Sequence, residues 1–201
     1  RHELELALRE KDERAERTLA RFRELGALAG ISPVLQGEVD EWLAGCFATL
    51  RAGLAAGVWP EDFDAARHPD QEGMTSLEVL REFAYFGLLV YRLEPAQVEP
   101  ILKRLHVKST TIRDVRALHG VQDTLAWLNS FPQVRASEVV ARLEPFPPRA
   151  LLVGWATRAH DVATRQLERY WGEWRFVRTA VDGAALKALG LPPSPLYGRL
   201  L

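Results

Sequence analysis

Residues 4–25 have the sequence LELALREKDERAERTLARFREL, in which apolar residues recur at steps of three and four between charged ones. This spacing predicts an amphipathic helix, because an α-helix brings every third and fourth residue to one face. The pattern is interrupted once, near Lys11-Asp12. Gly26 is placed to end the helix, and Ser32-Pro33 predicts a turn before a second helical run over 38–54. The apolar face comprises Leu4, Leu8, Ala15, Leu19, Phe22 and Leu25.

Helical spacing also dominates the rest of the chain. Thr75-Ser76-Leu77-Glu78 has the form of a capping box at the start of a helix. No segment alternates apolar and polar residues for long enough to predict a strand, and the β-branched stretch 176–181 is interpreted as a linker. The predicted fold class is therefore all-α. The further predicted helices cover 75–90, 96–105, 110–119, 122–129, 136–143, 149–159 and 162–174.

Two proline-containing segments divide these helices. Residues 58–75 are rich in proline, aspartate and glycine, which predicts a loop or an insertion. Pro145, Pro147 and Pro148 form the second break, and Pro148 suits the first turn of a helix. We therefore expect a multi-helix body over 1–145 and a small helical tail over 146–201.

The composition is that of an ordinary globular chain, since 47% of the 201 residues are hydrophobic and 26% are charged. The longest apolar runs, such as 150–156, are far too short to span a bilayer, so no membrane partner is expected. The N-terminus has no signal-peptide pattern, and the single cysteine, Cys46, predicts a reducing, cytoplasmic location. Because the chain begins with a charged helix and without methionine, we expect it to be part of a longer protein.

The net charge of −1 hides an asymmetry between the two halves of the chain. Residues 1–100 carry 11 Lys/Arg against 19 Asp/Glu, a net charge of −8, whereas residues 101–201 carry 15 against 8, a net charge of +7. A basic half attached to an acidic half concentrates positive potential where phosphates bind. The alternative interpretation is chance clustering on solvated helix faces.

Basic residues of the second half are the candidate RNA contacts. Arg158, Arg165 and Arg169 follow steps of seven and four, which places them on one helix face. A second basic group lies over 103–116. For each of these residues, an ordinary solvated position is the alternative. The candidates are Lys103, Arg104, Lys108, Arg113, Arg116, Arg158, Arg165, Arg169, Arg175, Arg178, Lys187 and Arg199.

The stretch 169–178, RYWGEWRFVR, mixes aromatic and basic residues. Bases stack on tyrosine and tryptophan while arginine contacts phosphate, so this composition suits RNA. Leu167, Trp171 and Trp174 follow helical spacing, however, which favours core positions for the two tryptophans. The arginines of the stretch are expected to face solvent or RNA.

Residues 181–201 have the sequence VDGAALKALGLPPSPLYGRLL, which predicts a short helix from Gly183 that ends at Gly190 before a proline-rich turn. The order of glycine, leucine and proline resembles the C-terminal signature of bacterial class II tRNA nucleotidyltransferases and poly(A) polymerases. Ala185 and Ser194 depart from that family, which usually has an acidic residue and a glycine there. Four further segments resemble the family's neck exit, body helix, Pro-Pro-x-Ala-Leu-Leu helix start and tail entrance: 2–8, 18–33, 144–152 and 169–177.

The resemblance implies that this chain is the RNA-binding, non-catalytic C-terminal portion of an enzyme that adds CMP or AMP to RNA 3′ ends. The enzyme's own head and neck would lie upstream and hold Mg²⁺ with CTP or ATP, so no cofactor is expected in this segment. The expected partner is tRNA or another RNA, held at the elbow and acceptor arm. The alternative function is a free-standing helical adaptor for proteins, which predicts an exposed apolar groove.

Two acidic motifs resemble metal sites but lack the surrounding pattern of one. No strand or Gly-Ser turn precedes Asp62-Phe63-Asp64, although a two-metal nucleotidyl-transfer site needs that context. His160-Asp161 resembles part of an HD phosphohydrolase site, but Asp161 is expected to cap the following helix instead. No catalytic or metal-binding residue is therefore predicted. The residues that would have to complete an HD site, without recognisable spacing, are His106 or His119 and Asp182.

Overall fold

In a computed structural model of the chain, the described residues are 2–10, 13–58, 76–177 and 187, and they form helices without a strand. The predicted all-α fold class is thereby confirmed. All but the first residue of the predicted loop at 58–75, and the tail beyond Val177 apart from Lys187, lie outside the described residues. Among the helices that are described, none combines the length and the apolar composition needed to cross a membrane. The division of the chain at 145/146 stays a prediction.

We call residues 2–104 the N-terminal region, and their described part forms seven helices. As predicted, the first amphipathic run is divided near residues 11–12, and Gly26 follows the second helix with φ 71°, a left-handed conformation that glycine adopts without strain. The helix expected over 38–54 begins instead at Glu41, because Asp40 accepts a hydrogen bond from the Leu43 N–H at 3.0 Å and caps it. The helices are α1 (His2–Arg9), α2 (Arg14–Glu24), α3 (Ala27–Ile31), α4 (Leu35–Glu38), α5 (Glu41–Ala55), α6 (Ser76–Val90) and α7 (Pro95–Arg104).

We call residues 109–176 the C-terminal region. One long helix replaces the separate helices predicted over 110–119 and 122–129, so that prediction was wrong. The reason is tertiary packing: a Cβ on Gly120 would lie 2.8 Å from the Phe146 ring, so this glycine makes room for Phe146 and does not break the helix. The elements are α8 (Ser109–Ser130), α9 (Ala136–Leu143), α10 (Pro148–Ala156), α11 (Asp161–Gly172) and the 3-10 helix η2 (Trp174–Phe176).

The chain breaks between α10 and α11, earlier than the predicted end at 159. Thr157 Oγ1 donates to the Gly154 carbonyl at 2.7 Å and accepts from the Ala159 N–H at 3.4 Å, at the point where α10 ends. His160 takes the N-cap position of α11 without a side-chain hydrogen bond, so the prediction that Asp161 caps the helix was wrong. Asp161 is the first helical residue, where a negative charge still interacts favourably with the helix dipole.

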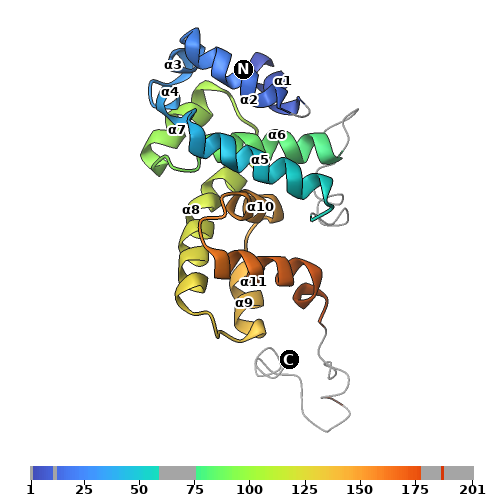
Figure 1. The fold of residues 1–201 in the computed structure, drawn as a ribbon. Helices are drawn as coiled ribbons and strands as arrows, with labels where there is room; N and C mark the ends of the chain where they lie inside the picture. The colour runs from blue at the N-terminus through green and yellow to red at the C-terminus, as the bar shows by residue number, and fades with distance from the viewer. Residues whose placement is uncertain (1, 11–12, 59–75, 178–186, 188–201) are drawn as a thin grey trace.

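Figure 1 shows the helices in successive layers, with α1 and α2 at one end, α5 and α6 next, and α9 and α11 towards the other end. α10 lies between these layers, and α8 runs along their side. α10 contacts α5, α6, α8 and α11, and all nine of its residues are buried. A helix that is almost entirely apolar around its axis is expected to be enclosed in this way.

Glycines allow α10 to approach its neighbours closely. Gly53 of α5 faces the Trp155 ring of α10, and a Cβ on Gly53 would overlap that ring. A Cβ on Gly87 of α6 would lie 2.8 Å from Val153, and one on Gly154 would lie 2.7 Å from side chains of α8. The three helix crossings therefore depend on residues without a side chain. Together they place α10 inside one buried apolar cluster that includes both regions.

A buried ion pair joins α8 to α10. Arg149 Nε donates to Asp114 Oδ2 at 2.5 Å, and neither side chain is more than 3% exposed. The Arg149 guanidinium also lies 4.3 Å from the ring centroid of Phe83 on α6. Since a buried charge is stable only with a partner, this pair fixes α8 and α10 relative to each other.

Candidate nucleic-acid interface

The first predicted basic group lies where α7 ends and α8 begins. Lys103 and Arg104 are exposed in the last turn of α7, where positive charge interacts favourably with the helix dipole. Lys108 is exposed at the N-cap position of α8. These three cations make no ion pair with another described residue, so their charge faces solvent.

Two further members of this group are held by carboxylates. Arg116 on α8 donates two hydrogen bonds to Glu99 on α7, at 2.6 and 2.9 Å. The hydrogen bond from Arg116 is also the main cause of the lowered pKa of Glu99. Arg113 Nε donates to Asp114 Oδ1 at 2.9 Å, on the carboxylate that also holds Arg149. Both arginines therefore have a structural role. Arg116 links α8 to α7, and Arg113 compensates part of the charge of the buried Asp114 carboxylate.

The second predicted group lies along α11 and begins with Arg158, just before that helix starts. The Arg158 guanidinium lies 4.2 Å from the Trp155 ring centroid and pairs with Glu168 at 2.9 Å. Glu168 also accepts the Trp155 Nε1–H at 2.8 Å. Arg158 therefore covers the edge of the core, and it adopts the uncommon φ of 48° in the connection.

Arg165 and Arg169 lie exposed one turn apart on α11. Arg165 makes no ion pair within the described part of the chain. Arg169 lies 4.6 Å from the Trp174 ring centroid and 3.6 Å from Glu173, a carboxylate that is itself 63% exposed. Exposed ion pairs contribute little stability, so an RNA phosphate can replace such a carboxylate at small cost. We call Arg165 and Arg169 the α11 arginines.

The aromatic residues of 169–178 divide between core and surface. Trp171 is buried and Trp174 packs partly buried against the core, so the predicted core positions are confirmed. Arg175 Nε donates to the Trp171 carbonyl at 2.9 Å, and its guanidinium lies 4.1 Å from the Phe176 ring centroid. Arg175 thus holds the end of α11 in place.

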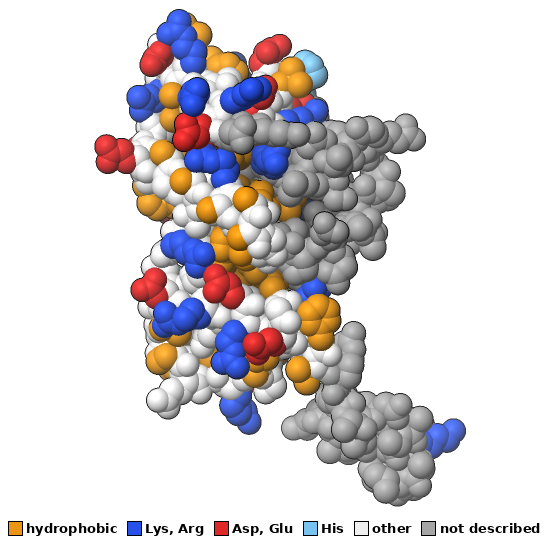
Figure 2. All heavy atoms as spheres, turned by 45° about the vertical axis from the view of Figure 1, so that its right-hand side comes forward, with side chains coloured by type: hydrophobic (Ala, Val, Ile, Leu, Met, Phe, Trp, Pro, Cys, Tyr) orange, Lys and Arg blue, Asp and Glu red, His pale blue; other side chains and the backbone are white. Residues whose placement is uncertain are grey.

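The two basic groups occupy different parts of the molecule. In Figure 1 the α7–α8 junction lies on the same side of α10 as α5 and α6, and α11 lies on the other side. Figure 2 shows positive and negative side chains interspersed on the face that it presents. The helices therefore bring the α11 arginines together but leave the first group apart from them. Lys187 is exposed, and Arg178 and Arg199 lie outside the described residues.

A feature that the sequence analysis missed lies where α8 turns into α9. The Trp127 and Phe131 rings pack with centroids 4.8 Å apart, and the Arg142 guanidinium of α9 lies 3.5 Å from the Trp127 centroid. Phe131 is 51% exposed. The Trp127 and Phe131 rings line an open groove of about 450 Å³, which we call the α8–α9 groove. Its lining residues are Trp127, Ser130, Phe131, Pro132, Gln133, Val134 and Glu138.

One carboxylate reaches this groove. Glu138 accepts a hydrogen bond from Arg135 at 2.7 Å, and this bond is the main cause of the lowered pKa of Glu138. Glu138 is therefore ionised at neutral pH, with Arg135 compensating its charge. Arg142 makes no ion pair with another described residue, although its charge also contributes to the lowered pKa of Glu138, so two arginines stand beside one carboxylate near the aromatic rings.

The described residues include no group of three or more His, Cys, Asp or Glu that would hold a metal. Burial raises the pKa of the Cys46 thiol to about 12, which removes it from nucleophilic chemistry at neutral pH. A second, smaller hollow of about 210 Å³ lies between α6, α7 and α8, with the Glu99–Arg116 pair and His119 in its lining. Asp62, Asp64 and Asp182 lie outside the described residues.

Comparison of the chain with protein families, with curated proteins and with solved structures finds no match. What the interface can do therefore follows from its own chemistry. Guanidinium groups bind phosphates, and exposed aromatic rings stack on bases. The C-terminal region carries exposed guanidinium groups on α11 and an exposed ring, that of Phe131, in the α8–α9 groove.

Proposed function

We propose that this chain is the RNA-binding, non-catalytic C-terminal portion of a cytoplasmic nucleotidyltransferase that adds CMP or AMP to RNA 3′ ends. The observation that carries the proposal is the pairing of exposed arginines with aromatic rings in the C-terminal region, Arg142 on Trp127 and Arg169 on Trp174. In each pair the ring holds a guanidinium at the surface, where it can bind a phosphate. The net charge of +7 over 101–201 supports the same function.

The sequence resemblance to class II tRNA nucleotidyltransferases and poly(A) polymerases supports the enzymatic part of the proposal. In this proposal a catalytic head and neck upstream hold Mg²⁺ with CTP or ATP and perform the transfer. The chain itself holds tRNA through phosphate and shape contacts. Without the head, its affinity for tRNA is expected in the range of about 10⁻⁴–10⁻⁶ M that is typical of electrostatic binding.

The test is a titration of tRNA with the 201-residue chain at several salt concentrations. Arg165→Glu with Arg169→Glu is expected to weaken binding and to flatten the slope of log affinity against log salt by about 0.7–0.9 per lost phosphate contact. The matched control is Arg14→Glu with Arg17→Glu. These two exposed arginines on α2 each pair with a carboxylate four residues earlier in the chain. If the control variant loses as much affinity as the α11 variant, or if the chain binds no tRNA, the proposal is wrong.

A second candidate function, the helical protein adaptor, is favoured by one observation. The lining of the α8–α9 groove is mostly apolar, and exposed apolar grooves accept peptide segments. This function predicts a protein ligand whose affinity changes little with salt. It also predicts that the α11 arginines can be reversed without effect on that ligand.

A further inference from the structure

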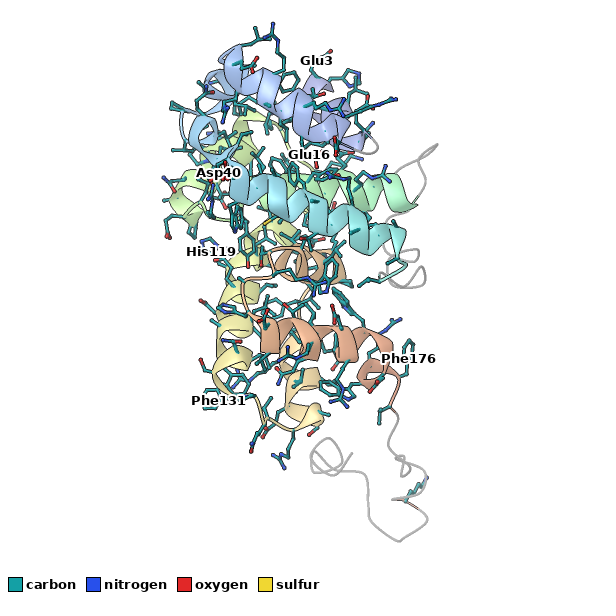
Figure 3. The ribbon with its side chains drawn as sticks, viewed as in Figure 1. Glu3, Glu16, Asp40, His119, Phe131 and Phe176 are labelled. Carbon is teal, nitrogen blue, oxygen red and sulfur yellow. The ribbon has the colours of Figure 1, made fainter. Side chains whose placement is uncertain are left out.

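The α8–α9 groove combines an open aromatic face with a cation. Arg142 covers the Trp127 ring, whereas Phe131 at the end of α8 keeps half of its surface exposed. Figure 3 shows Phe131 at the outer end of α8 in the C-terminal region. The volume of about 450 Å³ lies within the range of about 300–1,000 Å³ that small organic ligands occupy. A single nucleotide is a ligand of this size.

We propose that the α8–α9 groove binds one unstacked base of a single-stranded or looped RNA. Phe131 provides the stacking face, and Arg142 contacts the adjacent phosphate. The inference rests on the proposed function, because it assumes that the chain binds RNA. It goes further by naming a site outside the twelve basic residues that the sequence singled out.

Charge is the reason to prefer a nucleotide over an apolar peptide in this groove. Arg135 and Arg142 stand on the α9 side, and the single carboxylate, Glu138, is already bonded to Arg135. The excess of one positive charge is complementary to a phosphate. The Gln133 amide in the lining offers a donor and an acceptor to the edge of a base.

The experiment compares two RNA decamers of equal charge, decauridylate and a decamer with the same backbone in which every base is absent. Both lack stable structure, so the difference in affinity measures contacts to bases. The wild-type chain is expected to bind decauridylate about tenfold more tightly than the abasic decamer, the effect of one stacked base. Phe131→Ala is expected to abolish this difference while leaving affinity for the abasic decamer unchanged.

The matched control is Phe176→Ala, which removes the same ring at nearly equal exposure, 53% against 51%. Figure 3 shows Phe176 on the opposite side of the C-terminal region from Phe131. Phe176→Ala is expected to keep the tenfold difference. A variant with Arg142→Gln is expected to weaken binding of both decamers, because it removes the phosphate contact and leaves the ring.

Failure of this inference can be told apart from failure of the proposed function. If both decamers bind in a salt-dependent way, with equal affinity before and after Phe131→Ala, RNA binding stands and the base site is wrong. If the Phe176 variant loses the base dependence and the Phe131 variant keeps it, the site is also wrong. If neither decamer nor tRNA binds, both proposals fail and a protein ligand becomes the better candidate for the groove.

Discussion

In the N-terminal region, Arg9 and Arg51 are held by carboxylates from other helices, whereas in the C-terminal region several arginines lie over aromatic rings at the surface. Arg9 of α1 pairs with Glu82 of α6 at 2.6 Å, and Arg51 pairs with Glu16. In the C-terminal region, Arg142 covers Trp127 without a carboxylate from the described residues. The same side chain thus closes contacts between helices in one region and stays available to an anion in the other.

This difference follows the division of charge along the chain. The half with a net charge of −8 has an excess of carboxylates to neutralise its arginines, and the half with +7 does not. Exposed cations without a carboxylate partner generate the positive potential that attracts phosphates. Yet α10 of the C-terminal region packs against α5 and α6 of the N-terminal region, so the two regions are expected to differ in binding and not in folding.

Trp155→Ala is expected to have the largest effect, a loss of about 3–5 kcal/mol in the free energy of unfolding. Trp155 is 1% exposed, faces Gly53 of α5, and lies 6.3 Å from the Trp171 ring of α11. Because its ring touches both regions, hydrogen exchange should accelerate in α5 and in α11 alike. Urea unfolding followed by circular dichroism measures the free energy.

The control for this variant is Leu25→Ala, at a position 64% exposed, where a change within about 0.5 kcal/mol is expected. If α5 amides keep their wild-type protection in Trp155→Ala while α11 amides lose theirs, the regions fold independently. The conclusion that one buried core joins the two regions into a single folding unit would then be wrong.

Asp114→Ala is expected to lower the free energy of unfolding by about 3 kcal/mol, because it leaves the Arg149 charge buried without a carboxylate. Replacing both residues, with Asp114→Leu and Arg149→Met, should recover most of that loss, since apolar side chains of similar size need no charged partner. Thermal unfolding of the three proteins measures the difference. A double variant no more stable than Asp114→Ala would show that the pair contributes shape and not charge compensation.

The sequence predicted helices well where the signal is local. The break near residues 11–12, the left-handed Gly26 and the helix over 136–143 follow from periodicity and turn chemistry, which act over a few residues. The prediction of two helices over 110–119 and 122–129 was wrong, because Gly120 between them makes room for the Phe146 ring and does not end the helix. That ring comes from 26 positions further along the chain, so no local pattern announces the contact.

The candidate interface shows the same limit. The charges along the sequence predict a basic group, but they do not predict that Arg116 is held by Glu99 on another helix. The contact between Trp127 and Phe131 could have been predicted from the sequence, because the two aromatic residues are four positions apart at a helix end that is followed by proline. The position of Arg142 over Trp127 depends on how α9 packs against α8, which periodicity does not specify.

Alkaline pH is expected to destabilise the protein through the N-terminal region. Burial raises the pKa of Cys46 on α5 from 9.0 to about 12 and that of Tyr91 from 10.0 to about 12. In the unfolded chain the thiol ionises from about pH 9, whereas the folded chain keeps its proton, so stability falls as pH rises from 9 towards 12. The thiol alone should lower the free energy of unfolding by about 1 kcal/mol between pH 9 and pH 10.

Urea unfolding at both pH values, with Cys46→Ala as the comparison, measures this contribution. The variant loses stability at every pH because it leaves a small cavity. Its loss of unfolding free energy between pH 9 and pH 10, however, should be smaller than that of the wild-type chain by about 1 kcal/mol. An unchanged pH dependence in Cys46→Ala would mean that the thiol is already ionised, or accessible, in the folded protein.

The smallest effect is expected when an arginine of the N-terminal region loses its carboxylate partners and keeps only the aromatic ring beneath it, as Arg142 has in the C-terminal region. Arg92 lies 4.4 Å from the Trp42 ring centroid, but Glu38 and Asp40 hold it at 2.9 and 2.8 Å. Glu38→Gln with Asp40→Asn removes both charges and keeps the cap of α5, because asparagine caps helices as well as aspartate does. Stability should therefore change by about 1 kcal/mol or less.

Affinity for tRNA in this variant is expected to rise about twofold, with the salt slope steeper by about 0.7–0.9, the contribution of one additional phosphate contact. The matched comparison is Glu10→Gln with Glu13→Gln, which frees Arg14 and Arg17 on α2, where no described aromatic ring lies under either guanidinium. If only the Arg92 variant gains affinity, the aromatic ring beneath the cation is what distinguishes the two regions. If both variants gain equally, net charge alone accounts for the difference, and the aromatic partners of the C-terminal arginines serve only to hold those side chains in place.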